Sequence, residues 1–221
     1  MTAPGARARV RAELTREIAD AARRHLASEG AAGLSLRAVA RELGMASSAV
    51  YRYYPSRDDL LTALIVDAYD SLGTAVEETH GRVARDDLRG RLRAVCRAAR
   101  AWALAHPHEY ALVYGSPVPG YAAPKATIGP ASRVGEVLCW IVADSDRGTD
   151  RQGDTLLSPG IAERMSLSDD SDLAARAIVV WTSLFGLVSF EMFGHTNNVV
   201  ADHEAFFDRA VGQWADTLGL P

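Results

Sequence analysis

Apolar residues recur along the chain at spacings of three and four, which is the period of an α-helix, and the alternating pattern of a β-strand is scarce. Glycine, proline and capping residues divide this pattern into segments. In residues 10–30, Leu14, Ile18 and Leu26 share one stripe and Gly30 follows it, as in an amphipathic helix closed by a glycine. The chain is therefore predicted to be all-α.

Two short helices follow this first segment. Residues 34–44 offer Ser35 as an N-cap and Gly44 as a terminator, and after two further residues Ser47 can cap a third helix that Pro55 stops. Two short helices joined by a glycine-containing turn of about three residues have the spacing of a helix-turn-helix.

Longer helices are expected in the rest of the chain. Ser56 and Asp59 have the spacing of a capping box, which opens a helix predicted to run to Glu78. Residues 115–125 are a proline-rich connection, and residues 144–160 have the composition of a loop. Further helices are expected near residues 84–105, 107–114, 127–144, 171–194 and 201–219.

The third helix carries three tyrosines within four positions. At about 100° per residue its side chains separate into an inner side (Val50, Tyr54), an outer side (Ser48, Ala49, Arg52) and two edges (Tyr51, Tyr53). Small residues at its start, Ser47 included, allow close approach to base edges, and a phenol at the rim can donate to phosphate. The pattern favours a DNA-reading helix, although Tyr51 and Tyr53 also suit a core.

Charge is distributed unevenly along the chain. The net charge is −4, but residues 1–57 carry 10 arginines against 5 acidic residues (+5), which leaves −9 for residues 58–221. A basic segment on an acidic body fits a nucleic-acid-binding head, and it fits a solvated helix face equally well.

Nothing in the composition predicts a cofactor, a metal or a membrane span. Cys96 and Cys139 belong to no CxxC pattern and are expected to be buried thiols of an intracellular protein. The uncharged apolar run 177–190 is shorter than the roughly 20 residues that a span needs, and the N-terminus has no apolar signal region. The motif HPHE at 106–109 is interpreted as a loop before a helix rather than a metal site. A soluble cytoplasmic protein is predicted.

Residues 33–64, GLSLRAVARELGMASSAVYRYYPSRDDLLTAL, resemble the DNA-binding head of the tetracycline-repressor (TetR-type) family of bacterial transcriptional regulators. The resemblance covers about residues 10–64, and its motifs fall in register from Leu-Ser-Leu-Arg to Pro-Ser-Arg. One departure is Tyr54, where the family usually has phenylalanine. A phenol fits there if its hydroxyl reaches the surface of the domain.

The resemblance assigns DNA-facing positions. It implies that Ser47, Ser48, Ala49, Tyr51 and Tyr53 face DNA, that Arg57 grips a phosphate, and that Arg37 adds a contact. Arg37 also fits a solvated face. Arg7, Arg9 and Arg11 are expected either to enter the minor groove as an arm or to belong to a disordered terminus.

Two later segments, 101–121 and 181–195, are similar to a ligand-domain subclass of the same family that is marked by Trp, Gly and His (WHG), here Trp181, Gly186 and His195. The similarity implies a domain that binds a small effector and dimerises through its last two helices. The expected organisation is a flexible arm at 1–9, a helix-turn-helix domain at 10–56, and a ligand-binding and dimerisation domain at 57–221.

Aromatic residues are the candidates for the pocket and the dimer interface. Mostly apolar cavities with a few polar tips bind small molecules, although each of these residues is also a common core residue. The pocket candidates are Trp102, Tyr110, Tyr114, Tyr121, Trp140, Phe185 and His195. The interface candidates are Trp181 and a stripe of the last helix formed by Phe207, Val211, Trp214 and Leu218.

The expected function is a homodimeric regulator, a repressor rather than an activator, which binds a palindromic operator and is released by a small molecule. Three alternatives compete with it. An enzyme lacks support because no GxSxG, HExxH or phosphate-loop motif occurs. A membrane-surface protein is disfavoured because Glu13, Glu17 and Asp20 interrupt the basic first helix. A ligand-independent architectural DNA-binding protein stays open.

Overall fold

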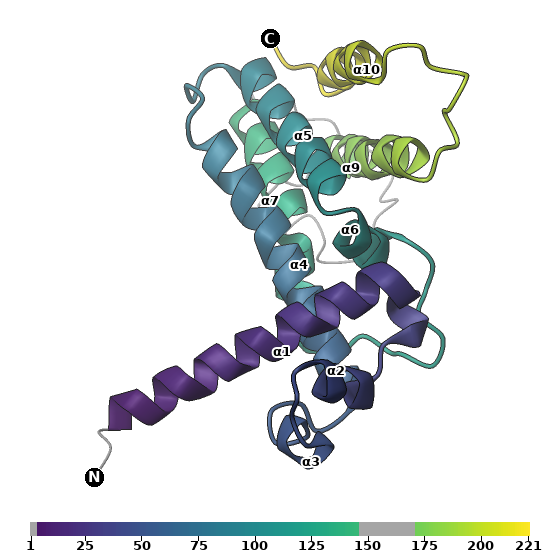
Figure 1. Ribbon diagram of the computed structural model, residues 1–221. Helices are drawn as coiled ribbons and strands as arrows, with labels where there is room; N and C mark the ends of the chain where they lie inside the picture. The colour runs from purple at the N-terminus through teal and green to yellow at the C-terminus, as the bar shows by residue number, and fades with distance from the viewer. Residues whose placement is uncertain (1–3, 146–170) are drawn as a thin grey trace. The chain divides into compact units, whose positions relative to one another are not determined.

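A computed structural model describes residues 4–145 and 171–221, and all regular structure within those ranges is helical (Figure 1). This confirms the predicted all-α fold class. The helices are α1 (Pro4–Gly33), α2 (Leu36–Glu42), α3 (Ser47–Val50), α4 (Arg57–His80), α5 (Leu88–Ala105), α6 (Pro107–Tyr114), the 3₁₀ turn η1 (Lys125–Thr127), α7 (Ile128–Ser145), α9 (Ser171–Met192) and α10 (His203–Thr217). The loop expected at 144–160 lies almost wholly outside the described residues.

The chain folds into two compact units. Unit 1 contains the described residues of 1–69 and 106–128, and unit 2 those of 70–105 and 129–221. The expected boundary after residue 56 differs from this division, because α4 is shared by both units and α6 groups with the head. The reason is packing: α6 lies against α1, and its Leu112 belongs to the core of unit 1.

In unit 1, α1 is longer than expected at both ends. It begins at Pro4, so residues 4–9, expected as a flexible arm, are helical, and it continues beyond Gly30 through a kink where that glycine has φ 70°. The buried side of α1 forms the core of the unit with α2 and α4. Arg24 joins α1 to α2 through Glu42 at 2.7 Å, and Arg23 joins α1 to α4 through Asp67 at 2.7 Å.

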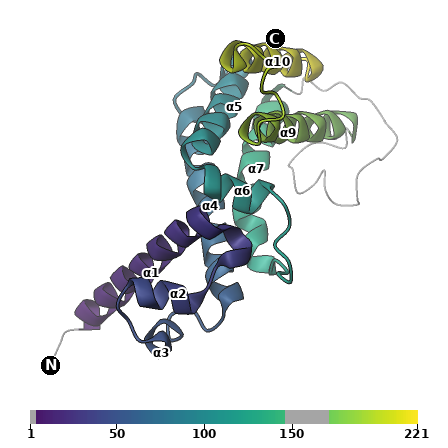
Figure 2. The ribbon, with the colours of Figure 1, turned by 45° about the vertical axis from the view of Figure 1, so that its right-hand side comes forward.

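The helix-turn-helix is formed by α2 and α3, which lie side by side in both ribbon views (Figures 1 and 2). Ser35 occupies the N-cap position of α2 as predicted, but its side chain makes no capping bond. Gly44 turns the chain with φ 65°. Helix α3 starts one residue earlier than predicted, since its N-cap is Ala46 and Ser47, the predicted cap, is its first residue.

The predicted pairing of Ser56 with Asp59 at the start of α4 is confirmed. The Ser56 hydroxyl accepts from the Asp59 N–H at 3.0 Å and donates to the Asp59 carboxylate at 2.7 Å. This satisfies one of the backbone donors that a helix N-terminus leaves open.

In unit 2, α10 packs against α5 and α9. Two arginines of α5 fasten this arrangement: Arg100 forms a two-pronged pair with Glu191 of α9 at 2.7 and 2.6 Å, and Arg97 pairs with Asp208 of α10. Bidentate pairs of this kind fix orientation as well as distance. Salt bridges as well as apolar packing therefore determine which faces of α9 and α10 are exposed.

Helix α9 is also the one helix among the described residues that is long and apolar enough to cross a membrane, over Ala174–Met192. Length and composition alone carry little weight here, because helices packed into folded domains pass the same test. Glu191 in this stretch is paired with Arg100 of α5, as expected for a helix held in a folded domain. The predicted apolar run 177–190 is thus the centre of a longer helix.

Helix α7 is fastened to the part of α4 that belongs to unit 2. Arg133 donates to Glu77 at 2.8 and 2.7 Å and to the Asp70 carboxylate at 3.0 Å. The pair holds the pKa of Glu77 below its ordinary value. A Cβ on Gly73 would lie 2.5 Å from the Arg133 guanidinium, so the glycine makes room for this contact.

Candidate nucleic-acid interface

The start of α3 exposes small residues, and two buried residues that follow them pack into the core of unit 1. Val50 is fully buried and Tyr54 is 8% exposed, both in the core of unit 1, as the helical projection predicted. Ser47 and Ser48 are exposed and Ala49 is half-buried. Side chains this short allow a helix to approach base edges closely, because no bulky group holds the backbone away.

The two edge tyrosines differ in their surroundings. Tyr51 is 42% exposed, whereas Tyr53 is half-buried and carries the Arg11 guanidinium 5.2 Å from its ring centre. Arg11 also donates to the Arg52 carbonyl at 3.4 Å. The first turns of α1 therefore contact the end of the α3 segment, a contact between residues 42 positions apart that the local pattern could not reveal.

The surroundings of Tyr54 explain how this chain accommodates a phenol where the family usually has phenylalanine. Its ring is buried, and its hydroxyl donates to the carbonyl of Thr15 on α1 at 3.5 Å. Burial raises the pKa of Tyr54, with a further rise from the nearby Asp67 carboxylate. The hydroxyl thus finds a partner inside unit 1, which stabilises the packing of α3 on α1.

Arg57, the expected phosphate grip, has partners within unit 1. Its guanidinium donates to the carbonyls of Leu34 at 3.1 Å, Ala31 at 2.7 Å and Ala32 at 3.4 Å. These carbonyls lie at and just after the C-terminus of α1, where helix carbonyls lack partners and a positive charge is favoured. Arg57 joins α4 to α1 in this structure, and its phosphate contact stays a prediction.

Arginines are prominent on the exposed surface of unit 1. Arg37 of α2 and Arg52 after α3 are exposed, and so are the arginines of the first turns of α1 (Arg7, Arg9, Arg11, Arg16). Exposed guanidinium groups contribute a sequence-independent attraction to the phosphate backbone, while the short α3 residues are suited to reading bases.

The pocket candidates are divided between the two units. Tyr110, Tyr114 and Tyr121 lie in unit 1, where the rings of Tyr110 and Tyr114 stack at 5.1 Å and the hydroxyl of Tyr121 is 2.9 Å from that of Thr62. The other four lie in unit 2. Trp102 donates to Ser71 at 2.9 Å, Phe185 is buried, His195 is exposed, and Trp140 lines a cavity at one end of α7.

The interface candidates of α10 are turned inward. Phe207, Val211 and Leu218 are 2–4% exposed within unit 2, where α10 packs on α5 and α9, and Trp214 meets Phe207 edge-to-face at 6.1 Å. The predicted stripe therefore belongs to the core of its own unit. Sequence periodicity identified the apolar stripe correctly, but it could not show whether the stripe contacts a partner chain or other helices of its own chain.

Several exposed apolar residues lie on α9 and just after it. Trp181, an interface candidate, is 36% exposed, and Gly186 is exposed with open space where a Cβ would be. His195 is exposed and its ring lies 5.1 Å from that of Phe190. The three residues of the WHG motif thus all lie on the surface of unit 2.

Comparisons with known proteins agree with this geometry. Residues 18–64 match the family described as bacterial regulatory proteins, tetR family, and residues 92–213 match the tetracyclin repressor-like C-terminal domain. The HTH-type transcriptional regulators Rv1816 of Mycobacterium tuberculosis and Mb1846 of Mycobacterium bovis are each 38% identical in an alignment of 214 positions that covers 92% of this chain and 92% of theirs.

Solved structures are similar over nearly the whole chain. The crystal structure of the regulatory protein SCO4313 is 32% identical, covers 94% of this chain and 98% of its own, and has a TM-score of 0.75. The TetR family regulator PfmR of Thermus thermophilus shares the fold at 17% identity and a TM-score of 0.57, with 91% and 96% covered. This family consists of transcriptional regulators and not of enzymes, which confirms the prediction of a non-enzymatic protein. The helix-turn-helix of α2 and α3, the matching C-terminal domain and the full-length relatives together show that the chain belongs to the TetR family of DNA-binding transcriptional regulators.

Proposed function

We propose that this regulator is a homodimeric repressor that binds a palindromic operator and is released by a small-molecule effector. The observation that supports it most is an exposed, uncharged stripe along α9 that carries large apolar side chains. We define the α9 stripe as Val179, Thr182, Gly186 and Phe190, which follow one another at spacings of three or four and are all exposed.

The α9 stripe suits a second copy of the same chain. Val179 is 54% and Phe190 56% exposed, and Phe193 just after α9 is 44% exposed. Phe206 at the start of α10 adds a further apolar side chain, 46% exposed. Large apolar side chains exposed along one face of a helix are typical of association surfaces, and a two-fold dimer would bring the stripe against its own copy.

Dimerisation also supplies what α3 needs. A single short helix reads few base pairs, whereas a two-fold dimer presents two such helices to half-sites about one helical turn or more apart. The operator is then an inverted repeat. Ser47, Ser48 and Ala49 would read bases, Tyr51 and Tyr53 would contact the backbone or a thymine methyl, and Arg37 would bind phosphate.

Effector control would act through α4. Residues 57–69 of α4 belong to unit 1 and residues 70–80 to unit 2. A ligand that favours one conformation of α4 in unit 2 would therefore change a helix that is also part of the DNA-binding unit. The effector must bind the DNA-free conformation more tightly, because equal affinity for both conformations shifts nothing. Such a repressor acts in the cytoplasm, where a bacterial chromosome lies.

Sedimentation equilibrium of the full chain tests the dimer. A dimer has twice the 23.7 kDa mass of one chain. We expect this mass at micromolar concentration, and the chain mass alone throughout that range would contradict the proposal. Release of operator by a member of a compound library then tests effector control. If DNA binding is dimeric but no compound releases it, the alternative of a ligand-independent architectural protein is favoured.

A further inference from the structure

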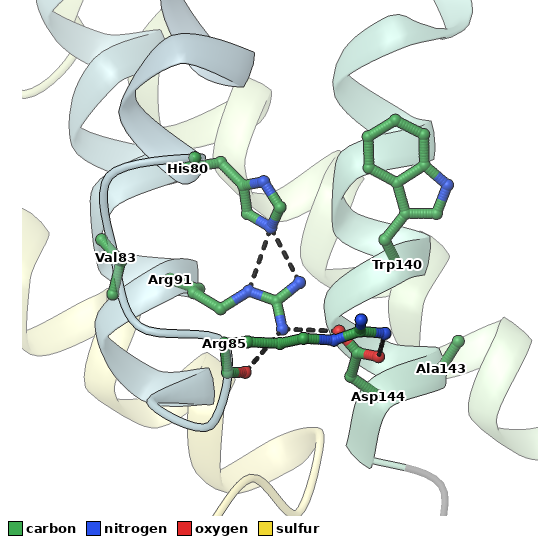
Figure 3. Close-up of a pocket in the computed structure, with 8 residues that line it drawn as sticks. His80, Val83, Arg85, Arg91, Trp140, Ala143 and Asp144 are labelled. Atoms are coloured by element: carbon green, nitrogen blue, oxygen red, sulfur yellow. Dashed lines mark hydrogen bonds and ion pairs between the residues drawn. The ribbon is translucent and has the colours of Figure 1, made fainter.

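A cavity of about 430 Å³ opens in unit 2, where the turn after α4 meets α5 and the end of α7 (Figure 3). This volume lies in the range of small-molecule sites. One part of the wall is charged and the other is aromatic or small. The lining residues are His80, Gly81, Val83, Arg85, Arg91, Trp140, Ala143 and Asp144.

The charged part of the wall is organised by Arg91. Its side chain is 4% exposed, and it donates to Asp144 at 2.6 Å, to the Arg85 carbonyl at 2.9 Å and to the His80 Nε2 at 2.8 and 3.0 Å. Because Nε2 of His80 accepts from a guanidinium, the imidazole is neutral and carries its proton on Nδ1. The buried guanidinium therefore holds both His80 and Asp144 in place.

The charges of the wall do not cancel. Arg85 and Arg91 carry two positive charges against one negative charge on Asp144, and His80 is neutral, so the lining has a net charge of +1. Asp86 lines an adjoining cavity, which shares Arg85 and Asp144, but it is absent from the lining of this one. A ligand with one negative charge would neutralise the wall.

Arg85 is the group placed to receive that charge. Its side chain is 86% exposed, and within the part of the chain that the structure describes its guanidinium makes one bond, from Nη2 to Asp144 at 2.9 Å. A guanidinium has five donors in a planar fork, so Arg85 retains donors for a carboxylate while it keeps Asp144. Figure 3 shows its side chain extending to Asp144 of α7.

Trp140 supplies the apolar part of the wall. Trp140 is 46% exposed, and its ring centre lies 6.4 Å from that of His80. Figure 3 shows it on α7, facing the helix end that carries His80. An exposed indole beside a guanidinium is suited to a ligand that has both an aromatic ring and an anionic group, because burial of ring against ring is favourable and the anion meets the arginine.

We propose that this cavity binds a small aromatic monocarboxylate, with the carboxylate on Arg85 and the ring against Trp140. The site is formed wholly by unit 2 and does not depend on dimerisation, on operator binding or on effector release. Either outcome for the proposed repressor function leaves it standing.

Isothermal titration calorimetry of the full chain with phenylacetate as the probe tests the site. The difference in affinity between phenylacetate and its neutral isostere phenylacetamide measures the contribution of the negative charge to binding. Arg85→Gln removes the expected carboxylate partner, and Trp140→Leu removes the aromatic wall. The matched control is Arg82→Gln, since Arg82 is 77% exposed on the same turn and is absent from the cavity lining.

We expect phenylacetate to bind the natural chain at least tenfold more tightly than phenylacetamide does. Arg85→Gln and Trp140→Leu should each weaken phenylacetate binding at least tenfold, while Arg82→Gln changes it less than twofold. Unchanged thermal unfolding of the Arg85→Gln protein shows that the loss is not due to misfolding. Equal binding of acid and amide, equal binding by Arg85→Gln, or no heat at millimolar phenylacetate would each overturn the proposal.

Discussion

The surface around α3 and the α9 stripe are both exposed, but their chemistry differs. The first combines short side chains with exposed arginines, while the second is neutral and carries large apolar side chains such as Val179 and Phe190. A surface of the first kind binds a polyanion with an affinity that salt weakens, whereas apolar burial is largely insensitive to salt. The two surfaces can therefore be tested separately.

The largest effect is expected from Gly186→Arg, which places a charged side chain in the middle of the α9 stripe. Nothing lies within 4 Å of a Cβ at this position, so the fold of unit 2 should tolerate the change while the apolar contact with a second copy does not. Operator affinity should fall at least about 100-fold, because a monomer retains one half-site. A mobility-shift titration measures this fall, and sedimentation equilibrium measures the mass.

Gly129→Arg is the matched control, since Gly129 is an exposed helical glycine of the same unit with open space around it. This variant should stay dimeric and keep its operator affinity. If Gly186→Arg also stays dimeric, the α9 stripe is not the interface.

The next effect concerns stability rather than binding. Arg57→Ala removes a guanidinium that donates to three carbonyls around the C-terminus of α1. We expect a loss of about 1–2 kcal/mol in the free energy of unfolding, as for hydrogen bonds to a charged group that is partly exposed. Urea unfolding measures this loss. The control is Arg52→Ala, because Arg52 is an exposed arginine nearby. The free energy of unfolding of this variant should lie within about 0.5 kcal/mol of that of the natural chain. Equal stability of the two variants would show that the contacts of Arg57 contribute little.

A smaller effect is expected from Arg37→Gln, which tests whether the exposed arginine of α2 binds phosphate. Each phosphate contact contributes about 0.9 to the slope of log affinity against log salt, so a dimer that loses two contacts should lose about 1.8. The matched control is Arg82→Gln in unit 2, which should leave the slope unchanged. An unaltered slope in Arg37→Gln would assign Arg37 to a solvated face.

The smallest effect is the pH dependence caused by His80. Burial is the main reason that the pKa of His80 is lowered, Arg91 lowers it further, and Asp144 opposes the change. Between that lowered pKa and the ordinary value of about 6.5 the unfolded chain binds more protons, so stability falls as the pH drops through about 6.5. Urea unfolding from pH 7.5 to 5.5 should show this loss, and His80→Gln should reduce it. An identical pH dependence in the variant would contradict the role of His80.

Local features were predictable from the sequence, and features that depend on distant residues were not. The order of the helices, the turn at Gly44 and the Ser56–Asp59 pairing follow from residues a few positions apart. The burial of Val50 and Tyr54 was predictable in the same way, because the two residues lie one helical turn apart and therefore share one face of the helix.

Tertiary partners explain what the sequence could not reveal. The stripe of α10 faces α5 and α9 because Arg97 and Arg100 of α5 fix those helices, and no local pattern distinguishes an intramolecular from an intermolecular apolar contact. Arg57 was expected at DNA from its motif position, yet its donors reach carbonyls more than 20 residues earlier. The boundary of unit 1 likewise depends on α6 packing against α1.

We propose above all that this chain reads DNA as a two-fold dimer through α3. Selection of bound sites from random duplex DNA with the purified full chain tests it most directly. We expect enrichment of an inverted repeat whose half-sites lie about one helical turn or more apart, and a loss of that enrichment when Ser48 is replaced by a bulky residue. Enrichment of no symmetric sequence by the natural chain would contradict it.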